Sequence, residues 1–336
     1  MAAAAGLGTQ FVSASRAGGL AQTVAQTGTT PPPTMALPPD SGLFRGFEAR
    51  WVRTDGADIF VRHGGTGPPL LLLHGNPQTL TIWHKIAGTL AARFHVVAAD
   101  LRGYGDSVGP IDGGEAHVNY SFRTMARDQV DVMAALGYDR FFLAGHDRGA
   151  RTAHRLALDH PGRVRRLALL DILPTRYVWS HASREWVLNS WHWSFMAQPD
   201  DMFERMIAAI PAREFVLRHL GRSGKPAFID DRALAEYVRC FTQKTIHGSC
   251  EDYRAAAGID LEHDEADHLA GRKVAVPTLV LWGRRSHTGR FYGGDLLSIW
   301  REAANEVTGG ALDTGHYLAE EAPQAVIEAF ERHFVP

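Results

Sequence analysis

Short apolar runs recur along the chain and alternate with segments of mixed polarity. The runs predict strands at residues 69–73, 94–99, 141–144 and 167–170, with a half-buried strand at 58–62. The segments between them predict helices at residues 83–92, 121–136 and 148–159. Strands that alternate with helices in this way favour a mostly parallel sheet covered by helices.

The pattern changes at residue 174. From there to about residue 264 the chain is helical, aromatic and charged in pattern, with no clear strand, and a strand pattern returns at 275–282. We therefore expect an α/β core formed by residues 41–173 and 265–336. Residues 174–264 are expected to form a helical cap over the carboxyl edge of the sheet. Ligands of such sheets bind at that edge, so we expect the pocket between cap and core.

The first 40 residues differ in composition from the rest. They are rich in Ala, Gly, Thr and Pro, and Arg16 is the one charge among the first 39. Such a segment cannot bury enough apolar surface to fold, so residues 1–40 are expected to be a disordered extension. The alternative is that Met35 is the true start, since core-like patterns begin soon after it.

Composition narrows the class of protein. Of 336 residues, 45% are hydrophobic and 21% are charged, which provides enough apolar material for a large core. Lys and Arg total 35 against 37 Asp and Glu, unlike the basic balance of a nucleic-acid binder. No apolar stretch is long enough to span a membrane. Two cysteines, Cys240 and Cys250, cannot form a disulfide framework, so we expect a reducing, cytoplasmic location.

A strand–turn–helix motif carries the first chemical signal. Gly145-His146-Asp147-Arg148-Gly149 stands where a predicted strand meets a predicted helix, in the pattern Gly-x-nucleophile-x-Gly. Glycines suit this place because the turn is tight and the two backbones crowd each other. The nucleophile is Asp rather than Ser, and an ionised carboxylate can attack saturated carbon to give an alkyl ester. Asp147 therefore favours carbon–halogen or epoxide chemistry over esterase chemistry.

Such an elbow is followed along the chain by an acid and then by a histidine. Of 17 histidines, His316 lies after the last strand pattern and just before a helix, where the base is expected. No carboxylate follows the strand at 275–282 within residues 282–287. Asp171, which ends the strand at 167–170, is therefore predicted to orient the imidazole. The alternative is that Asp171 only caps a turn.

The loop after the first buried strand is a candidate for transition-state binding. It reads His74-Gly75-Asn76-Pro77. This loop and the residue after the nucleophile, Arg148, are expected to supply backbone N–H donors to an oxyanion hole. The Asn76 amide could also reach a leaving halide, or Asn76 is a plain turn residue.

Two arginines near the nucleophile indicate the charge of the substrate. Arg148 and Arg151 stand three apart on the helix that starts at the elbow, so they can share a face. Guanidinium groups bind carboxylates through two parallel hydrogen bonds, so the pair favours a carboxylate substrate. The alternative for Arg151 is an ordinary surface position.

Taken together, these motifs resemble those of the fluoroacetate (haloacetate) dehalogenases of the α/β-hydrolase superfamily. The resemblance covers about residues 41–335. It rests on matching segments at residues 74–79, 145–151, 170–175, 192–195, 250–254 and 315–316. It implies an α/β-hydrolase fold with a helical cap. It also implies hydrolysis of fluoroacetate and chloroacetate to glycolate and halide.

The resemblance also implies roles for individual residues. Asp147 would be the nucleophile, His316 the base and Asp171 its acid partner. The substrate carboxylate would be bound by Arg148 and Arg151. The leaving halide would be received by His192, Trp193 and Tyr253. These three halide-binding roles come from the resemblance alone.

Two positions depart from the family pattern. Asn76 stands where the family usually has an aromatic residue. An Asn at this place resembles the pattern of the haloalkane dehalogenases. Leu220 stands near the place of a cap tryptophan that narrows the family's pocket. Both positions bear on how strongly the smallest substrate is preferred.

Three other functions remain open at this stage. An epoxide hydrolase would use the same Asp, His and acid with a donor such as Tyr177, Tyr237 or Tyr253, although paired arginines do not suit a neutral epoxide. A haloalkane dehalogenase is favoured by Asn76. A ligand-binding protein on this fold can keep the same residues without turnover. The mechanism requires no metal and no organic cofactor, and the family resemblance favours a homodimer.

Overall fold

The structure is a computed structural model that describes residues 35–221 and 224–335. Of the extension predicted at residues 1–40, the part up to residue 34 therefore lies outside the described residues. Among the described residues, no helix is both long enough and apolar enough to cross a membrane.

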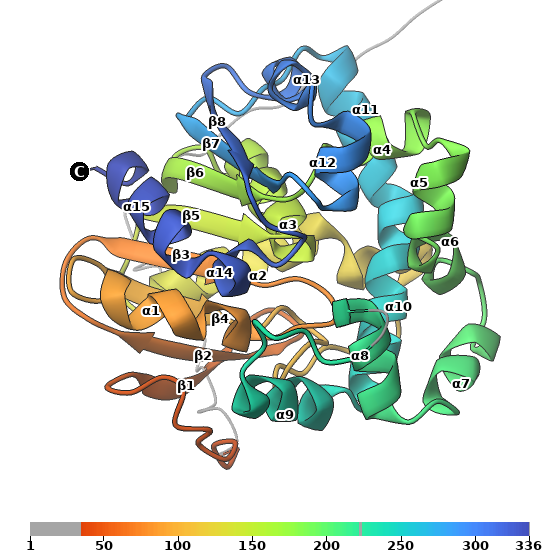
Figure 1. Ribbon diagram of the computed structural model, residues 1–336, viewed down its shortest axis with the longest axis horizontal. Coiled ribbons are helices and arrows are strands. Elements are labelled where there is room, and N and C mark those ends of the chain that lie inside the picture. Colours follow the sequence, from red (N-terminus) through yellow and green to blue (C-terminus); the bar gives the residue numbers. More distant parts are fainter. Residues whose placement is uncertain (1–34, 222–223, 336) are drawn as a thin grey trace, which may run out of the picture. The chain divides into compact units, whose positions relative to one another are not determined.

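The core is one eight-stranded sheet in the described part of the chain, with the strand order β1-β2-β4-β3-β5-β6-β7-β8 (Figure 1). β1 and β2 pair antiparallel with each other, β2 pairs antiparallel with β4, and the remaining neighbours are parallel. The strands are β1 (Glu48–Arg53), β2 (Asp58–Gly64), β3 (Pro69–Leu73), β4 (His95–Ala99), β5 (Phe141–His146), β6 (Val164–Leu170), β7 (Thr278–Gly283) and β8 (Val307–Leu312). The mostly parallel sheet predicted from the sequence is confirmed.

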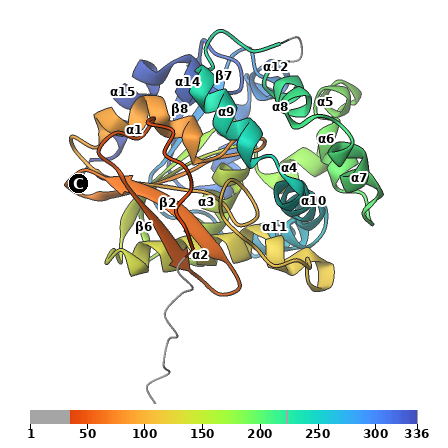
Figure 2. The ribbon, with the colours of Figure 1, turned by 90° about the horizontal axis from the view of Figure 1, so that it is seen from below.

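The apolar runs form the central strands because both faces of the sheet are covered. Leu70 and Leu72 of β3 pack into one hydrophobic cluster, and Leu71 and Leu73 pack into the other. On one face lie α1 (His84–Leu90), α14 (Leu318–Glu321) and α15 (Pro323–His333), and on the other lie α2 (Phe122–Ala135) and α3 (Arg148–Asp159) (Figure 2). α13 (Leu296–Ala303) packs into the same hydrophobic cluster as α2 and α3. This double cover explains why alternating polarity is missing from the central strands.

The two edge strands, β1 and β8, were not predicted as strands with defined bounds. β1 has only one buried residue, Val52, and β8 includes Thr308, Gly309 and Gly310 in place of a long apolar run. An edge strand is covered less completely than a central one, so burial leaves a weaker signal in its sequence.

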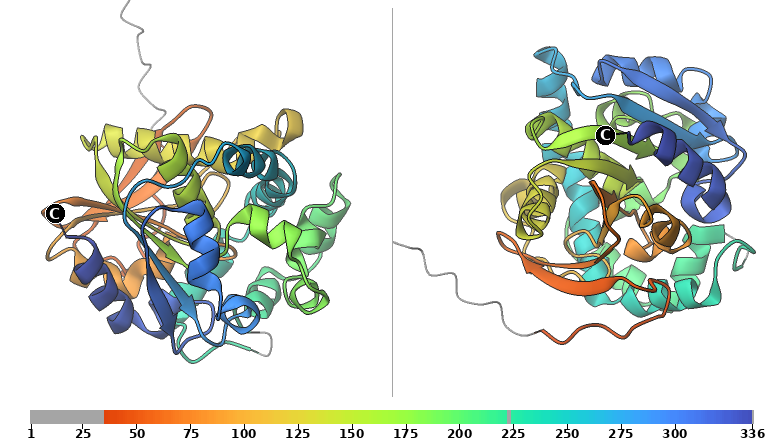
Figure 3. Two further views of the ribbon diagram at one scale, coloured as in Figure 1. Left: turned by 90° about the horizontal axis from the view of Figure 1, so that it is seen from above. Right: turned by 90° about the vertical axis from the view of Figure 1, so that its left-hand side faces the viewer.

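The segment between β6 and β7 contains helices joined by loops, with no strand within residues 174–221 and 224–264 (Figure 3). Its helices are α4 (Thr175–Ser180), α5 (Arg184–Asn189), α6 (His192–Met196), α7 (Met202–Ala208), α8 (Ala212–Gly221), α9 (Asp231–Cys240), α10 (Gln243–Ala257) and α11 (Ile259–Leu269). α11 continues past residue 264, so the helical insertion extends beyond the boundary drawn from the sequence.

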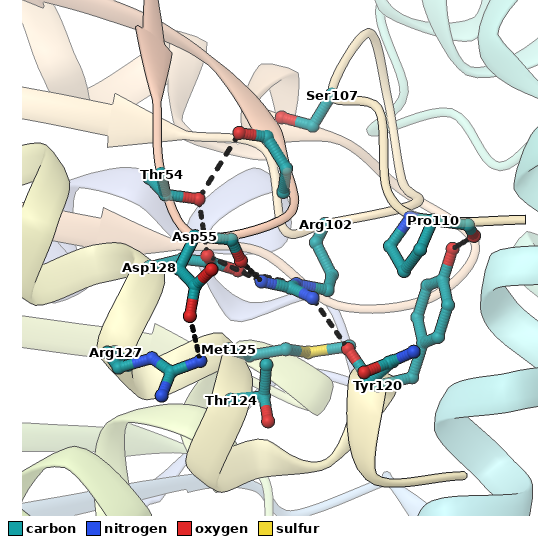
Figure 4. A network of polar contacts seen from close by, with 12 residues as sticks. Thr54, Asp55, Arg102, Ser107, Pro110, Tyr120, Thr124, Met125, Arg127 and Asp128 are labelled. Atoms are coloured by element: carbon teal, nitrogen blue, oxygen red, sulfur yellow. Dashed lines mark hydrogen bonds and ion pairs between the residues drawn. The ribbon is translucent and has the colours of Figure 1, made fainter. Parts of the chain in front are cut away.

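A buried ion pair fixes the loop that follows β4 (Figure 4). Arg102 donates to Asp128 of α2 through Nε and Nη2, both at 2.7 Å, and to the carbonyl oxygens of Asn119 and Asp55. The Thr54 hydroxyl donates to the same carboxylate. Burial raises the pKa of Asp128, and Arg102 opposes that shift. The network holds this loop against the sheet, and the loop carries Tyr104 toward the cap.

Candidate active site

Asp147 occupies the sharp turn between β5 and α3. Its backbone has φ 50° and ψ −116°, a conformation that costs energy for a non-glycine residue. A Cβ added to Gly145 would lie 2.4 Å from the carbonyl oxygen of Gly149, and one added to Gly149 would lie 2.3 Å from that of His74. Only glycine fits either place, as the crowding argument predicts. The turn lifts the Asp147 side chain to the carboxyl edge of the sheet.

A backbone donor from the loop after β3 holds the nucleophile. The N–H of Asn76 donates to Oδ1 of Asp147 at 3.0 Å. The loop that was predicted to supply an oxyanion donor therefore places one backbone N–H against this carboxylate.

The three residues of the predicted triad lie together. His316 donates from Nδ1 to Oδ2 of Asp171 at 2.5 Å, and its Nε2 lies 3.9 Å from Oδ2 of Asp147. The other oxygen of Asp171 accepts from the backbone N–H of Gly283 and from the hydroxyl of Ser286. The imidazole is thus fixed in the tautomer that turns Nε2 toward Asp147.

Neighbouring charges shift the pKa of Asp147 and of His316 in opposite directions. Burial raises the pKa of Asp147, but His316, His146, Arg148 and Arg151 outweigh it and hold that pKa well below its usual range. Burial lowers the pKa of His316, but the hydrogen bond to Asp171 outweighs this and raises it. Asp147 is therefore ionised at neutral pH.

A cavity of about 440 Å³ opens between the sheet edge and the cap. The predicted site residues that line it are Asn76, Asp147, Arg151, Asp171, His192, Trp193, Leu220 and His316. Two others, Arg148 and Tyr253, lie outside this lining. Tyr253 packs against His192 and Trp193, with ring centroids 5.7 and 6.0 Å apart, and it lies beneath the Arg148 guanidinium.

Arg148 forms a buried ion pair with Asp252 of the cap. Its Nε and Nη2 donate to the two carboxylate oxygens of Asp252 at 2.8 and 2.5 Å, and Tyr104 donates to Asp252 at 2.6 Å. Nη1 is buried without a hydrogen-bond partner among residues 35–221 and 224–335. The bidentate edge that was expected to meet a substrate carboxylate is therefore occupied in this structure, and Nη1 is the part of the group that is left.

Arg151 is a buried cation that faces the cavity. It is 5% exposed, and its Nη1 donates to the Leu173 carbonyl and the Thr175 hydroxyl, both at 3.0 Å. Within the described part of the chain no carboxylate lies within 4 Å of its guanidinium nitrogens, and its Nε is buried there without a hydrogen-bond partner. Burial and the neighbouring Arg148 lower the pKa of Arg151 to about 10. Its direct hydrogen-bond acceptors are neutral, and Asp147 and Asp264 act on it only through longer-range attraction, so this position favours an anionic ligand.

The three residues assigned to the halide come from two cap helices. His192 and Trp193 belong to α6, and Tyr253 belongs to α10. Burial and the neighbouring His219 lower the pKa of His192 well below its usual value, so its ring is neutral. The indole of Trp193 packs against the guanidinium of Arg151 at 4.5 Å. The cap thus gathers the three side chains that the family resemblance singled out.

Asp252 and Ser286 were missed as members of this site. Asp252 stands inside a segment that was used for the resemblance, yet only its neighbour Tyr253 received a role. Ser286 stands after β7, where a carboxylate was sought and not found, and its hydroxyl instead fixes Asp171.

Comparison with known proteins gives consistent matches. The family model for the alpha/beta hydrolase fold matches residues 68–323. A fluoroacetate dehalogenase of Burkholderia sp is 42% identical over 284 residues, 84% of this chain and 91% of that protein. A soluble epoxide hydrolase of Corynebacterium sp. (strain C12) is 30% identical over 292 residues, 81% and 92% of the two chains. The solved ALR0039 protein of Nostoc sp PCC 7120 has a TM-score of 0.82 at 50% identity, covering 86% of this chain and 98% of that one.

Proposed function

The chain belongs to the haloacetate dehalogenase family of the α/β-hydrolase superfamily, and from that premise we propose that it hydrolyses fluoroacetate and chloroacetate to glycolate and halide. Hydrolase chemistry is common to its dehalogenase and epoxide hydrolase relatives. The choice between carbon–halogen and epoxide bonds depends on the charge of the cavity.

Arg151 is the observation that carries this proposal. It is a buried guanidinium in the lining of the cavity that contains Asp147, with only neutral hydrogen-bond acceptors. A haloacetate brings a carboxylate that compensates this charge and places C2 in front of the nucleophile. A neutral epoxide would bring no negative charge to this buried guanidinium.

Two of the tyrosines that could donate a proton to an epoxide contact other residues instead. The hydroxyl of Tyr237 donates to Glu320 at 2.9 Å, and Tyr177 stacks on His181 with ring centroids 4.0 Å apart. Neither tyrosine lines the cavity. This arrangement favours dehalogenation over epoxide opening.

The first chemical step is an in-line displacement. A carboxylate oxygen of Asp147 attacks C2, the C2–halogen bond breaks, and the halide leaves with the bonding electrons. The product is an ester between Asp147 and the acetate unit. His192 and Trp193 supply N–H donors for the departing halide, which matters most for fluoride because its charge develops in the transition state.

The second step restores the enzyme. His316 takes a proton from water, and the resulting hydroxide attacks the carbonyl carbon of the Asp147 ester. Glycolate leaves, Asp147 is again a carboxylate, and the imidazolium later loses its proton to solvent. Asp171 stabilises that imidazolium, and the Asn76 N–H stabilises the oxyanion.

The direct test is halide release by the purified protein. We expect steady release of chloride from chloroacetate and of fluoride from fluoroacetate, with glycolate formed in equal amount. Ion chromatography measures both products in one sample. Turnover of epoxides with no halide release from either acid would overturn the proposal.

Replacing Arg151 with leucine tests recognition of the carboxylate. Because the variant loses the cation that the substrate anion compensates, we expect KM for chloroacetate to rise about 100-fold. KM for the neutral chloroacetamide should change much less. Arg140→Leu, at an exposed arginine outside the cavity, is the matched control and should behave as the unsubstituted protein does. An equal rise in KM for both compounds would contradict carboxylate binding by Arg151.

A further inference from the structure

We propose that Asp252 is a positioning residue of this site. It holds the Arg148 guanidinium, and through that group it fixes the rings of Trp193 and Tyr253. The inference rests on the proposed function, in which Trp193 receives the departing halide. Asp252 is 0% exposed and does not line the cavity, so it acts through its neighbours and not on the substrate.

The Arg148 guanidinium lies among aromatic rings. Its Cζ is 4.1 Å from the ring centroid of Tyr253, 4.8 Å from that of Phe122 and 5.6 Å from that of Trp193. A cation close to aromatic rings is attracted by their π electrons, so the guanidinium and the rings hold each other in place. Trp193 lines the cavity. A displaced guanidinium would therefore move a ring that belongs to the cavity wall.

Asp252 determines where that guanidinium lies. Its carboxylate accepts from Nε and Nη2 of Arg148 at 2.8 and 2.5 Å, and its backbone carbonyl accepts from Nη2 at 3.1 Å. Both side chains are 0% exposed, so each charge depends on the other where water is excluded. Burial lowers the pKa of Arg148, but Asp252 outweighs this and raises it. The guanidinium therefore stays charged, and its place is set by this carboxylate.

A third segment of the chain fixes the carboxylate. The hydroxyl of Tyr104 donates to Oδ2 of Asp252 at 2.6 Å. Burial and the charge of Asp252 raise the pKa of Tyr104 well above its usual value, so the hydroxyl keeps its proton. The loop of Tyr104 also touches α10 directly, since a Cβ added to Gly248 would lie 2.8 Å from Cα of Gly103. The loop after β4, the start of α3 and the cap helix α10 thus meet at one carboxylate.

The carboxylate end of the cavity has separate anchors. Arg151 donates to the Leu173 carbonyl and the Thr175 hydroxyl, and neither bond involves Asp252. A loosened Asp252 pair should therefore disturb release of the halide more than binding of the substrate carboxylate. Fluoride depends most on well-placed donors, because its charge develops in the transition state. Fluoroacetate should then suffer more than chloroacetate.

Two variants test this inference with both acids as substrates. Both acids form the same ester on Asp147, and kcat/KM covers only the steps up to displacement, so a changed ratio of kcat/KM values reports on halide release. For Asp252→Asn we expect kcat/KM to fall about 100-fold for fluoroacetate and less than about tenfold for chloroacetate. Tyr104→Phe retains both buried charges and should change the ratio in the same direction by about threefold. The inhibition constant of acetate should stay within about twofold in both variants.

Another buried ion pair of α3 provides the matched control. Asp267→Asn removes a carboxylate from Arg155, in a pair that joins α3 to α11. It should lower the temperature of thermal unfolding and leave the fluoride-to-chloride ratio unchanged. An equal loss on both acids in Asp252→Asn would show a merely structural role and overturn the inference. A weaker hold on acetate with an unchanged ratio would overturn it as well, because Asp252 would then act at the carboxylate end.

The position of the Trp193 ring can also be followed without turnover. Protein labelled with ¹⁵N-tryptophan contains eight indole N–H groups, and Trp193→Phe identifies the signal of Trp193 in the NMR spectrum. We expect this signal to shift in Asp252→Asn and in Tyr104→Phe, and to stay in place in Asp267→Asn. An unmoved signal in Asp252→Asn would contradict positioning of the ring by Asp252. If neither acid releases halide, the proposed function fails, and this spectrum still decides whether Asp252 positions Trp193.

Discussion

Asp147→Asn is expected to lower steady halide release about 10⁵-fold or more. The asparagine amide carries no negative charge, so it cannot displace halide at a useful rate. The substitution is well suited to the site because Asn tolerates positive φ better than most residues, and Asp147 has φ 50°. The loss should therefore fall on kcat, with the fold intact. Chloride release from chloroacetate measures it.

A matched carboxylate elsewhere controls for the change of charge. Asp139→Asn alters an exposed residue whose partner is the surface arginine Arg163, and it should leave turnover as it was. Thermal unfolding of both variants checks that each is folded. Turnover by Asp147→Asn within tenfold of the unsubstituted rate would show that Asp147 is not the nucleophile.

His316→Asn is expected to release about one halide per site and then stop. Displacement at C2 needs only the ionised Asp147, whereas hydrolysis of the ester needs a base to activate water. The steady rate should fall about 10⁴-fold, while the first turnover remains visible as a burst. Intact-protein mass spectrometry should then show a carboxymethyl adduct, about 58 Da heavier than the free protein.

A neighbouring histidine provides the control for this burst. The ring centroids of His287 and His316 lie 5.3 Å apart, but it is His316 that donates a hydrogen bond to Asp171. Burial and His316 lower the pKa of His287 to about 4. His287→Asn should keep multiple turnover, without an accumulated adduct. Steady multiple turnover by His316→Asn would show that His316 is not the base.

The sequence by itself determined the features that depend on nearby residues. Continuous apolar runs marked the central strands, because a strand covered on both faces is apolar at every position. The glycines of the elbow were foreseen because a tight strand-to-helix turn excludes a Cβ. Asp147 and His316 followed from their positions relative to those strands. The edge strands β1 and β8 were not predicted, because partial burial leaves only a weak hydrophobic pattern in the sequence.

Only the tertiary structure decided which distant groups meet. His316 and Asp171 are 145 residues apart, and Arg148 and Asp252 are 104 residues apart. Spacing along the chain showed that Arg148 and Arg151 can share a helix face, but not that a cap helix would bring a carboxylate to one of them and leave the other facing the cavity. A buried charge or lone pair acquires its role from the partner that folding places beside it, and local sequence does not specify that partner.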